Sequence, residues 1–171
     1  VCDRLGIYVE QENAACFKGD NGFGIYNPPQ DFLAGFAEMI EGARNHPSVI
    51  IWSLANESSF EKTYAFRAEY RYVKDVDRTR PVIFSYPRTV RTKPLPYDIF
   101  SWHYQKVTGR LGSHKMPVLH DEFAHVSCYN IENLKEENSS RAFWGESIRR
   151  GWERIFHTDG ALGCAIWAGI D

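Results

Sequence analysis

The sequence predicts an α/β fold in which parallel strands alternate with helices. Several apolar runs of strand length are continuous rather than alternating, as in parallel strands covered on both faces. Between these runs, apolar residues recur at the spacing of one helix face. Such a series leaves two architectures, an open doubly wound sheet or a closed eight-stranded barrel. No Gly-rich phosphate loop opens a helix, and polar, aromatic and acidic residues follow several runs, so we favour the barrel, a (β/α)8 or TIM barrel.

The expected strands are the short apolar runs at residues 6–10, 48–54, 81–86, 98–102, 117–121 and 162–167. A complete barrel has eight strands and about 250 residues. Two strands are therefore missing from this chain of 171 residues. Residues 12–30 hold three Gly and two Pro, and we expect them to form a long loop where a strand ends.

The expected helices are marked by three apolar stripes. They are Phe32, Phe36, Met39, Ile40 and Ala43; then Tyr64, Ala68, Tyr72 and Val76; and last Trp144, Ile148, Trp152, Ile155 and Phe156. Asp31 is placed to cap the first helix, and Ser139 or Ser140 to cap the last. Pro47 and Pro81 fit stop signals just beyond the first two helices.

Composition favours one globular unit, residues 1–171, with 43% hydrophobic residues and no internal repeat. Lys and Arg number 20 against 22 Asp and Glu, without a block of like charge, so neither nucleic acid nor a membrane is expected as a partner. No apolar run approaches the roughly 18 residues of a membrane span. The four cysteines lie far apart without a C-x-x-C pair, so we expect buried free thiols rather than a zinc cluster or a disulfide framework.

Two of the apolar runs end in a glutamate, Glu57 and Glu122. Parallel strands deliver their last residues to one rim, and a glutamate pair of this kind can serve as proton donor and nucleophile in glycosidic bond cleavage. The alternative interpretation of Asn56 and Glu57 is the start of a helix, with Asn as the cap. Asp121 competes with Glu122, but alternation along the strand points the two side chains to opposite faces.

Aromatic residues stand at the ends of two further runs. Tyr104 is a candidate to donate a hydrogen bond from its hydroxyl group to Glu122. The alternative interpretation is that Tyr104 is an ordinary aromatic residue at the rim. Trp167 could stack on the apolar face of a sugar ring. The alternative interpretation is that Trp167 belongs to the hydrophobic core. Core is also the expected place of Trp144 and Trp152 on their helical stripe.

Four segments then resemble glycoside hydrolase family 2, the family of β-galactosidases, β-glucuronidases and β-mannosidases. Residues 44–58 (RNHPSVIIWSLANES) resemble its acid/base signature, and residues 117–125 (PVLHDEFAH) resemble its nucleophile strand. Residues 163–167 (GCAIW) resemble its last strand, and residues 2–9 (CDRLGIYV) also match. Because order and spacing agree, the resemblance covers essentially the whole chain.

The resemblance implies an incomplete (β/α)8 barrel with strands 3 to 8 present. It also implies roles for the matching residues, which are Glu57 as acid/base, Glu122 as nucleophile, Asn56 at the sugar 2-hydroxyl, Tyr104 on the nucleophile, and His125 and Trp167 on the sugar. The Glu-Phe-Ala-His run is closer to the β-galactosidase version of the strand. Magnesium-dependent members carry Glu and His where this chain has Ala15 and Phe17, so we expect no metal site and no cofactor.

The implied partners are a β-glycoside substrate and the missing barrel strands and β-sandwich domains of a longer chain. A second copy of the protein is a further candidate partner. Two rival functions remain. One is a non-catalytic carbohydrate-binding or interaction module on the same fold. The other is a metal-dependent barrel hydrolase with His103, His120 and Asp121 as ligands. Within the family, β-glucuronidase or β-mannosidase specificity is the alternative to β-galactosidase.

Overall fold

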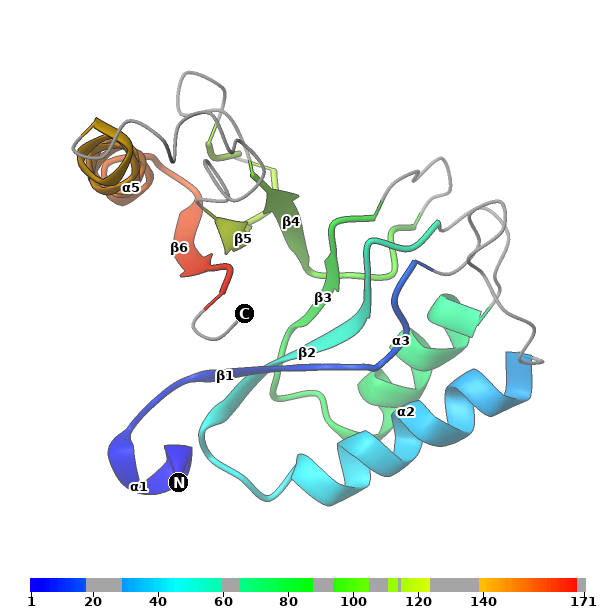
Figure 1. Ribbon diagram of the computed structural model, residues 1–171. Helices are drawn as coiled ribbons and strands as arrows, with labels where there is room; N and C mark the ends of the chain where they lie inside the picture. The colour runs from blue at the N-terminus through cyan, green and yellow to red at the C-terminus, as the bar shows by residue number, and fades with distance from the viewer. Residues whose placement is uncertain are drawn as a thin grey trace. The chain divides into compact units, whose positions relative to one another are not determined.

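The strands of the protein are parallel and follow one another in sequence order (Figure 1). The computed structural model describes residues 1–17, 29–59, 65–87, 94–104, 111–113, 115–123 and 139–168. The chain divides into two compact units, Val1–Phe100 and Ser101–Asp171. Each predicted strand overlaps an observed one, so the predicted order of strands is confirmed.

The first unit holds α1, β1, α2, β2, α3, β3 and the start of β4. Their bounds are α1 Cys2–Leu5, β1 Val9–Glu12, α2 Pro29–Ala43, β2 Val49–Asn56, α3 Ala65–Val76, β3 Val82–Ser85 and β4 Ile99–His103. The first strand begins later than predicted because residues 2–5 form a helical turn, which Gly6 ends in the left-handed conformation at φ 69°. Glycine adopts that conformation without steric cost.

The core of the first unit lies between β2, β3 and the two longer helices. Trp52, Phe66 and Phe84 are fully buried, and the rings of Phe66 and Phe84 meet edge to face with centroids 4.8 Å apart. Burial of each such side chain stabilises the fold by about 1.5–3 kcal/mol. The continuous apolar run of β2 is therefore the centre of this unit, as the sequence pattern predicts.

Helix α2 buries part of the predicted stripe but begins earlier than predicted, and the Phe32 side chain lies outside the described part. Phe36 and Ile40 are fully buried. The helix starts at Pro29, so Asp31 lies inside its first turn and is not its cap. Proline suits the first helical position because the N–H that it lacks has no partner there.

Helix α3 occurs where it was predicted, but it buries a different face. Its buried residues are Phe66, Glu69 and Val73, whereas Val76 of the predicted stripe is 39% exposed. The hydropathy pattern missed this face because one of its positions is a glutamate. Tyr64 of the predicted stripe lies outside the described residues.

A buried polar cluster ties the beginning of β2 to the residues that follow α3. The Arg80 guanidinium donates to the carbonyl of Val49 at 2.6 Å and to the Asp77 carboxylate at 2.6 Å. Asp77 also accepts the indole N–H of Trp52 at 3.0 Å. The strand that ends in Asn56 is thus fixed by side-chain bonds as well as by its neighbouring strands.

The second unit holds the end of β4, then β5, α5 and β6. Their bounds are β5 Val118–Phe123, α5 Ser139–Phe156 and β6 Ala161–Ile166. Its core is formed by Leu111, Phe123 and Ile155, against which Ile148 packs. The prediction that Trp152 belongs to the core is wrong, because it is 45% exposed, and the side chain of Trp144 lies outside the described part.

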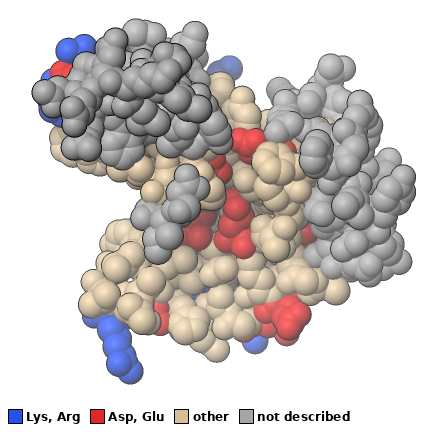
Figure 2. Space-filling model, in the orientation of Figure 1, with Lys and Arg blue, Asp and Glu red and all other residues tan. Residues whose placement is uncertain are grey.

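The described cysteines carry free thiols. Cys2, Cys16 and Cys164 are half-buried rather than buried as predicted, and Cys128 lies outside the described residues. Within the described part of the chain, no helix is long and apolar enough to cross a membrane. On the face drawn in Figure 2, Lys and Arg side chains of the described residues stand apart and form no broad basic patch.

Candidate active site

The ends of the strands share an unusual backbone conformation. Among the described residues, those other than glycine with positive φ are Phe17, Glu57, Tyr86 and Tyr104, with φ between 41° and 53°. Glu57, Tyr86 and Tyr104 directly follow the last residues of β2, β3 and β4, and Phe17 follows a bridge from Cys16 to Asn56. A left-handed conformation costs a residue with a side chain about 1–3 kcal/mol, and such positions cluster at functional sites.

In the first unit, backbone bonds from two neighbours fix Asn56 and Glu57. The Asn56 N–H donates to the carbonyl of Ala15 at 2.9 Å, and the Asn56 carbonyl accepts from the Phe17 N–H at 3.1 Å. The Glu57 N–H donates to the carbonyl of Ser85 at 2.9 Å. Glu57, a predicted site residue, is therefore presented on a rigid strand end.

The Asn56 carboxamide has a side-chain partner on each neighbouring side. Its Nδ2 donates to Cys16 Sγ at 3.5 Å, and its Oδ1 accepts from Ser85 Oγ at 3.4 Å. Asn56 is the last residue of β2, and residues 57–59 that follow it are not helical, so the alternative of Asn56 as a helix cap is wrong.

In the second unit, Glu122 of β5 meets residues from the end of β4. The Tyr104 hydroxyl donates to Glu122 Oε2, and the Tyr104 N–H donates to the Glu122 carbonyl at 2.9 Å. The His103 Nδ1 lies 3.5 Å from the same Oε2. The Glu122 side chain is only 11% exposed, so most of it is removed from solvent.

His103 also approaches the neighbouring carboxylate. Its Nε2 lies 3.7 Å from Asp121 Oδ1, and that carboxylate accepts a hydrogen bond from the Ser101 hydroxyl. Alternation along β5 predicted opposite directions for Asp121 and Glu122. The two carboxylates nevertheless reach one imidazole, because its ring nitrogens project from different edges.

The other predicted residues of the second unit have different surroundings. Trp167 directly follows β6, and its side chain is 47% exposed, so the core interpretation is wrong. His120 is fully buried and donates from Nε2 to the Leu111 carbonyl at 2.9 Å. Burial lowers the pKa of the His120 imidazole. His125 lies outside the described residues.

Sequence reasoning overlooked Cys16, Ser85 and the bridging position of His103. Strand register is the signal that locates Ser85 and Cys16 beside Asn56. Ser85 pairs with Asn56 in the sheet, and Cys16 forms a β-bridge with Asn56. The signal for His103 is the alternation of buried residues along β4, which places Ser101 and His103 on one face.

Comparison with known proteins identifies the family. Residues 1–127 match the family model described as glycosyl hydrolases family 2, TIM barrel domain. A β-galactosidase of Yersinia pseudotuberculosis serotype O:1b is 31% identical over 145 residues, which is 74% of this chain and 13% of that protein. The chain therefore spans a small part of the length of the curated relatives it matches.

Solved structures show the same fold at lower identity. A family 2 β-galacturonidase from Eisenbergiella tayi bound to galacturonate matches with a TM-score of 0.71 and 21% identity, over 97% of this chain and 34% of that one. A β-D-glucuronidase from Dictyoglomus thermophilum matches with a TM-score of 0.71 and 20% identity, over 97% of this chain and 34% of that one. The chain belongs to glycosyl hydrolase family 2, whose members hydrolyse glycosidic bonds, and it forms an incomplete (β/α)8 TIM barrel.

Proposed function

We propose that the protein to which this chain belongs is a retaining β-glycosidase in which Glu122 is the nucleophile and Glu57 the acid/base. In the first step, a Glu122 carboxylate oxygen bonds to the anomeric carbon while the bond from that carbon to the leaving oxygen breaks. The departing oxygen keeps the bonding electron pair and takes a proton from Glu57. The products are the free aglycone and a glycosyl ester on Glu122.

In the second step, Glu57 acts as a base. Its carboxylate takes a proton from water as the water oxygen bonds to the anomeric carbon, and the ester bond to Glu122 breaks. The sugar leaves with the configuration it had in the substrate, because two inversions have occurred. Asn56 binds the sugar 2-hydroxyl, and Tyr104, His125 and Trp167 complete the site.

The observation that supports this proposal most directly is the hydrogen bond from Tyr104 to Glu122. A nucleophilic carboxylate has to present one oxygen to the substrate in a fixed orientation. The Tyr104 hydroxyl and His103 Nδ1 both approach Oε2 of Glu122 and hold the group. Glu57 also lies at a strand end, as a group that acts on the leaving oxygen requires.

For the sugar, we propose a β-galactoside. The curated relatives are named β-galactosidase at 31% identity. The structural matches named β-glucuronidase and β-galacturonidase are about 20% identical and show the fold alone. The test is to measure kcat/KM for nitrophenyl β-galactoside, β-glucuronide and β-mannoside. A higher kcat/KM for the β-glucuronide or the β-mannoside would contradict this choice.

Two measurements on the protein in its natural full length test the mechanism. Proton NMR of the first-formed sugar should show the β-anomer. The Glu122→Gln variant should lose activity by roughly a thousandfold or more. The Glu57→Ala variant should lose much less activity on a dinitrophenyl glycoside than on a methyl glycoside, because dinitrophenolate departs without a proton.

The matched control is Asp121→Asn, which removes the adjacent carboxylate and leaves Glu122 in place. We expect this variant still to form the glycosyl ester, which mass spectrometry with a slow fluorinated substrate detects. Ester formation by Glu122→Gln would refute the assignment of the nucleophile. A first-formed α-anomer would refute retention, and sugar binding without turnover would favour the non-catalytic module.

A further inference from the structure

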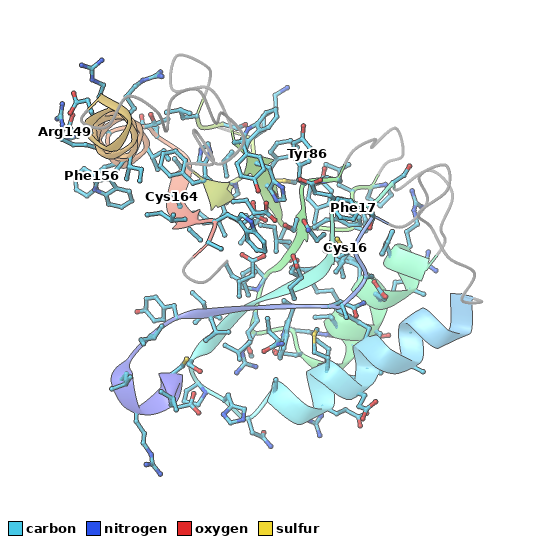
Figure 3. The ribbon with its side chains drawn as sticks, in the orientation of Figure 1. Cys16, Phe17, Tyr86, Arg149, Phe156 and Cys164 are labelled. Carbon is cyan, nitrogen blue, oxygen red and sulfur yellow. The ribbon has the colours of Figure 1, made fainter. Side chains whose placement is uncertain are left out.

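The Asn56 carboxamide lies between two side chains to which the sequence analysis gives no role. Cys16 follows β1 and Ser85 ends β3, so they flank the end of β2 from opposite sides. Figure 3 shows Cys16, Phe17 and Tyr86 grouped at this end of the strands of the first unit. Asn56 Nδ2 donates to Cys16 Sγ, and Ser85 Oγ donates to Asn56 Oδ1.

We propose that Ser85 and Cys16 are positioning residues that hold the Asn56 carboxamide for the substrate 2-hydroxyl. The inference rests on the proposed function, because that function gives Asn56 its contact with the sugar. Neither residue touches the reacting atoms, and both act through Asn56.

The need for side-chain support follows from the geometry of asparagine. Backbone bonds to Ala15 and Phe17 fix the main chain of Asn56, but they leave its two side-chain torsions free. An amide that must be ordered when substrate binds loses conformational entropy at that moment. Contacts to both ends of the amide remove that loss in advance.

The two contacts also leave the amide able to bind a sugar. A carboxamide has two acceptor positions on Oδ1 and two hydrogens on Nδ2. Ser85 occupies one acceptor position and Cys16 takes one hydrogen. The remaining acceptor position and hydrogen suit a hydroxyl group, which both donates and accepts.

The test compares substrates with and without the 2-hydroxyl group. In the full-length protein, kcat/KM is measured for nitrophenyl β-galactoside and its 2-deoxy analogue with Ser85→Ala and Cys16→Ala. Each variant should lose about two- to tenfold on the 2-hydroxy substrate, the range for one neutral hydrogen bond. On the 2-deoxy substrate the loss should vanish, because the amide has no hydroxyl to bind there.

Three further variants calibrate the comparison. Asn56→Ala should show a larger loss with the same dependence on the 2-hydroxyl group. Cys16→Ser keeps a hydrogen-bond acceptor and should retain activity close to that of the wild type. Cys2→Ala removes a thiol from α1, before β1 begins, and should leave kcat/KM unchanged for both the 2-hydroxy and the 2-deoxy substrate. If Ser85→Ala fails to fold, Cys16→Ala makes the same comparison from the other side of the amide.

Each remaining outcome is decisive. Equal losses on both substrates in Ser85→Ala and Cys16→Ala would overturn the positioning role while the proposed function stands. An Asn56→Ala loss that does not depend on the 2-hydroxyl would overturn both the role of Asn56 and this inference. Absence of hydrolysis of every β-glycoside by the wild type would overturn the proposed function itself, and the inference with it.

Discussion

The buried carboxyl of Glu69 should make the protein less stable as the pH rises. Glu69 lies on the inner face of α3 and is 0% exposed. Its Oε1 accepts from the Asn13 amide at 3.2 Å, and its Oε2 is buried without a hydrogen-bond partner. Burial raises the pKa of this carboxyl to about 9, because removal from water penalises the charged form.

The magnitude follows from the difference between the folded and unfolded states. The pKa of an unburied glutamate is 4.5. Above that pH the unfolded chain loses the proton while the folded chain keeps it, so stability falls as pH rises until the folded pKa is reached. Integrated from pH 4.5 to pH 7, this linkage lowers the free energy of unfolding by about 3 kcal/mol.

Glu69→Gln tests this reasoning because glutamine keeps an oxygen for the Asn13 amide and cannot ionise. Urea unfolding is measured from about pH 4 to about pH 8 for both proteins. At the acid end the two should have similar stability, and near pH 7 the variant should be more stable by up to about 3 kcal/mol. The matched control is Glu38→Gln, the same chemical change on the exposed surface of α2.

Parallel pH profiles of the wild type and Glu69→Gln would refute the argument. They would mean that the carboxyl ionises in the folded state, either through water that reaches Oε2 or through local opening of α3. A protonated-carboxyl band in the infrared spectrum near neutral pH, absent in the variant, would identify the group directly.

Three further predictions concern stability, each measured by unfolding of the variant against the wild type. Asp77→Ala removes the carboxylate that pairs with the mostly buried Arg80 guanidinium and should destabilise by about 3 kcal/mol. Hydrogen bonding with Ser48 is the main cause that lowers the pKa of Asp3 well below 3.8. Because the folded state favours the ionised form, this carboxylate stabilises the fold above about pH 4. This stabilisation is lost on acidification, and Asp3→Asn should remove that part of the acid dependence. Gly151→Ala places a Cβ 2.3 Å from the Phe123 ring and should destabilise by about 1–3 kcal/mol, whereas no change would show that the ring can move aside.

Much of the fold can be predicted from the sequence because its signals are local. Continuous apolar runs and helical stripes follow from backbone periodicity, so the order of strands and helices is written in short windows. The same windows place Asn56, Glu57 and Glu122 at strand ends or one residue from them. Trp52 lies in the core because a strand covered on both faces buries residues that point to either side.

The helix faces show where local signals fail. Hydropathy predicted a stripe for α3 that includes Val76, yet the packed face carries Glu69, whose charge is suppressed by its surroundings. Likewise Trp152 has the character of a core residue and is exposed. A hydropathy pattern treats each side chain as if it were isolated in water. Packing decides which polar side chains are buried and which apolar ones stay exposed.

The sequence alone determined the strands, the helices α2, α3 and α5, their order and the two glutamates, because these depend on residues close together in the chain. The tertiary structure decided the contacts of Asn56 with Cys16 and Ser85 and the place of His103 beside Asp121 and Glu122. These contacts join residues far apart in the sequence. Their geometry depends on strand register and on strained backbone at the strand ends, which no local pattern encodes.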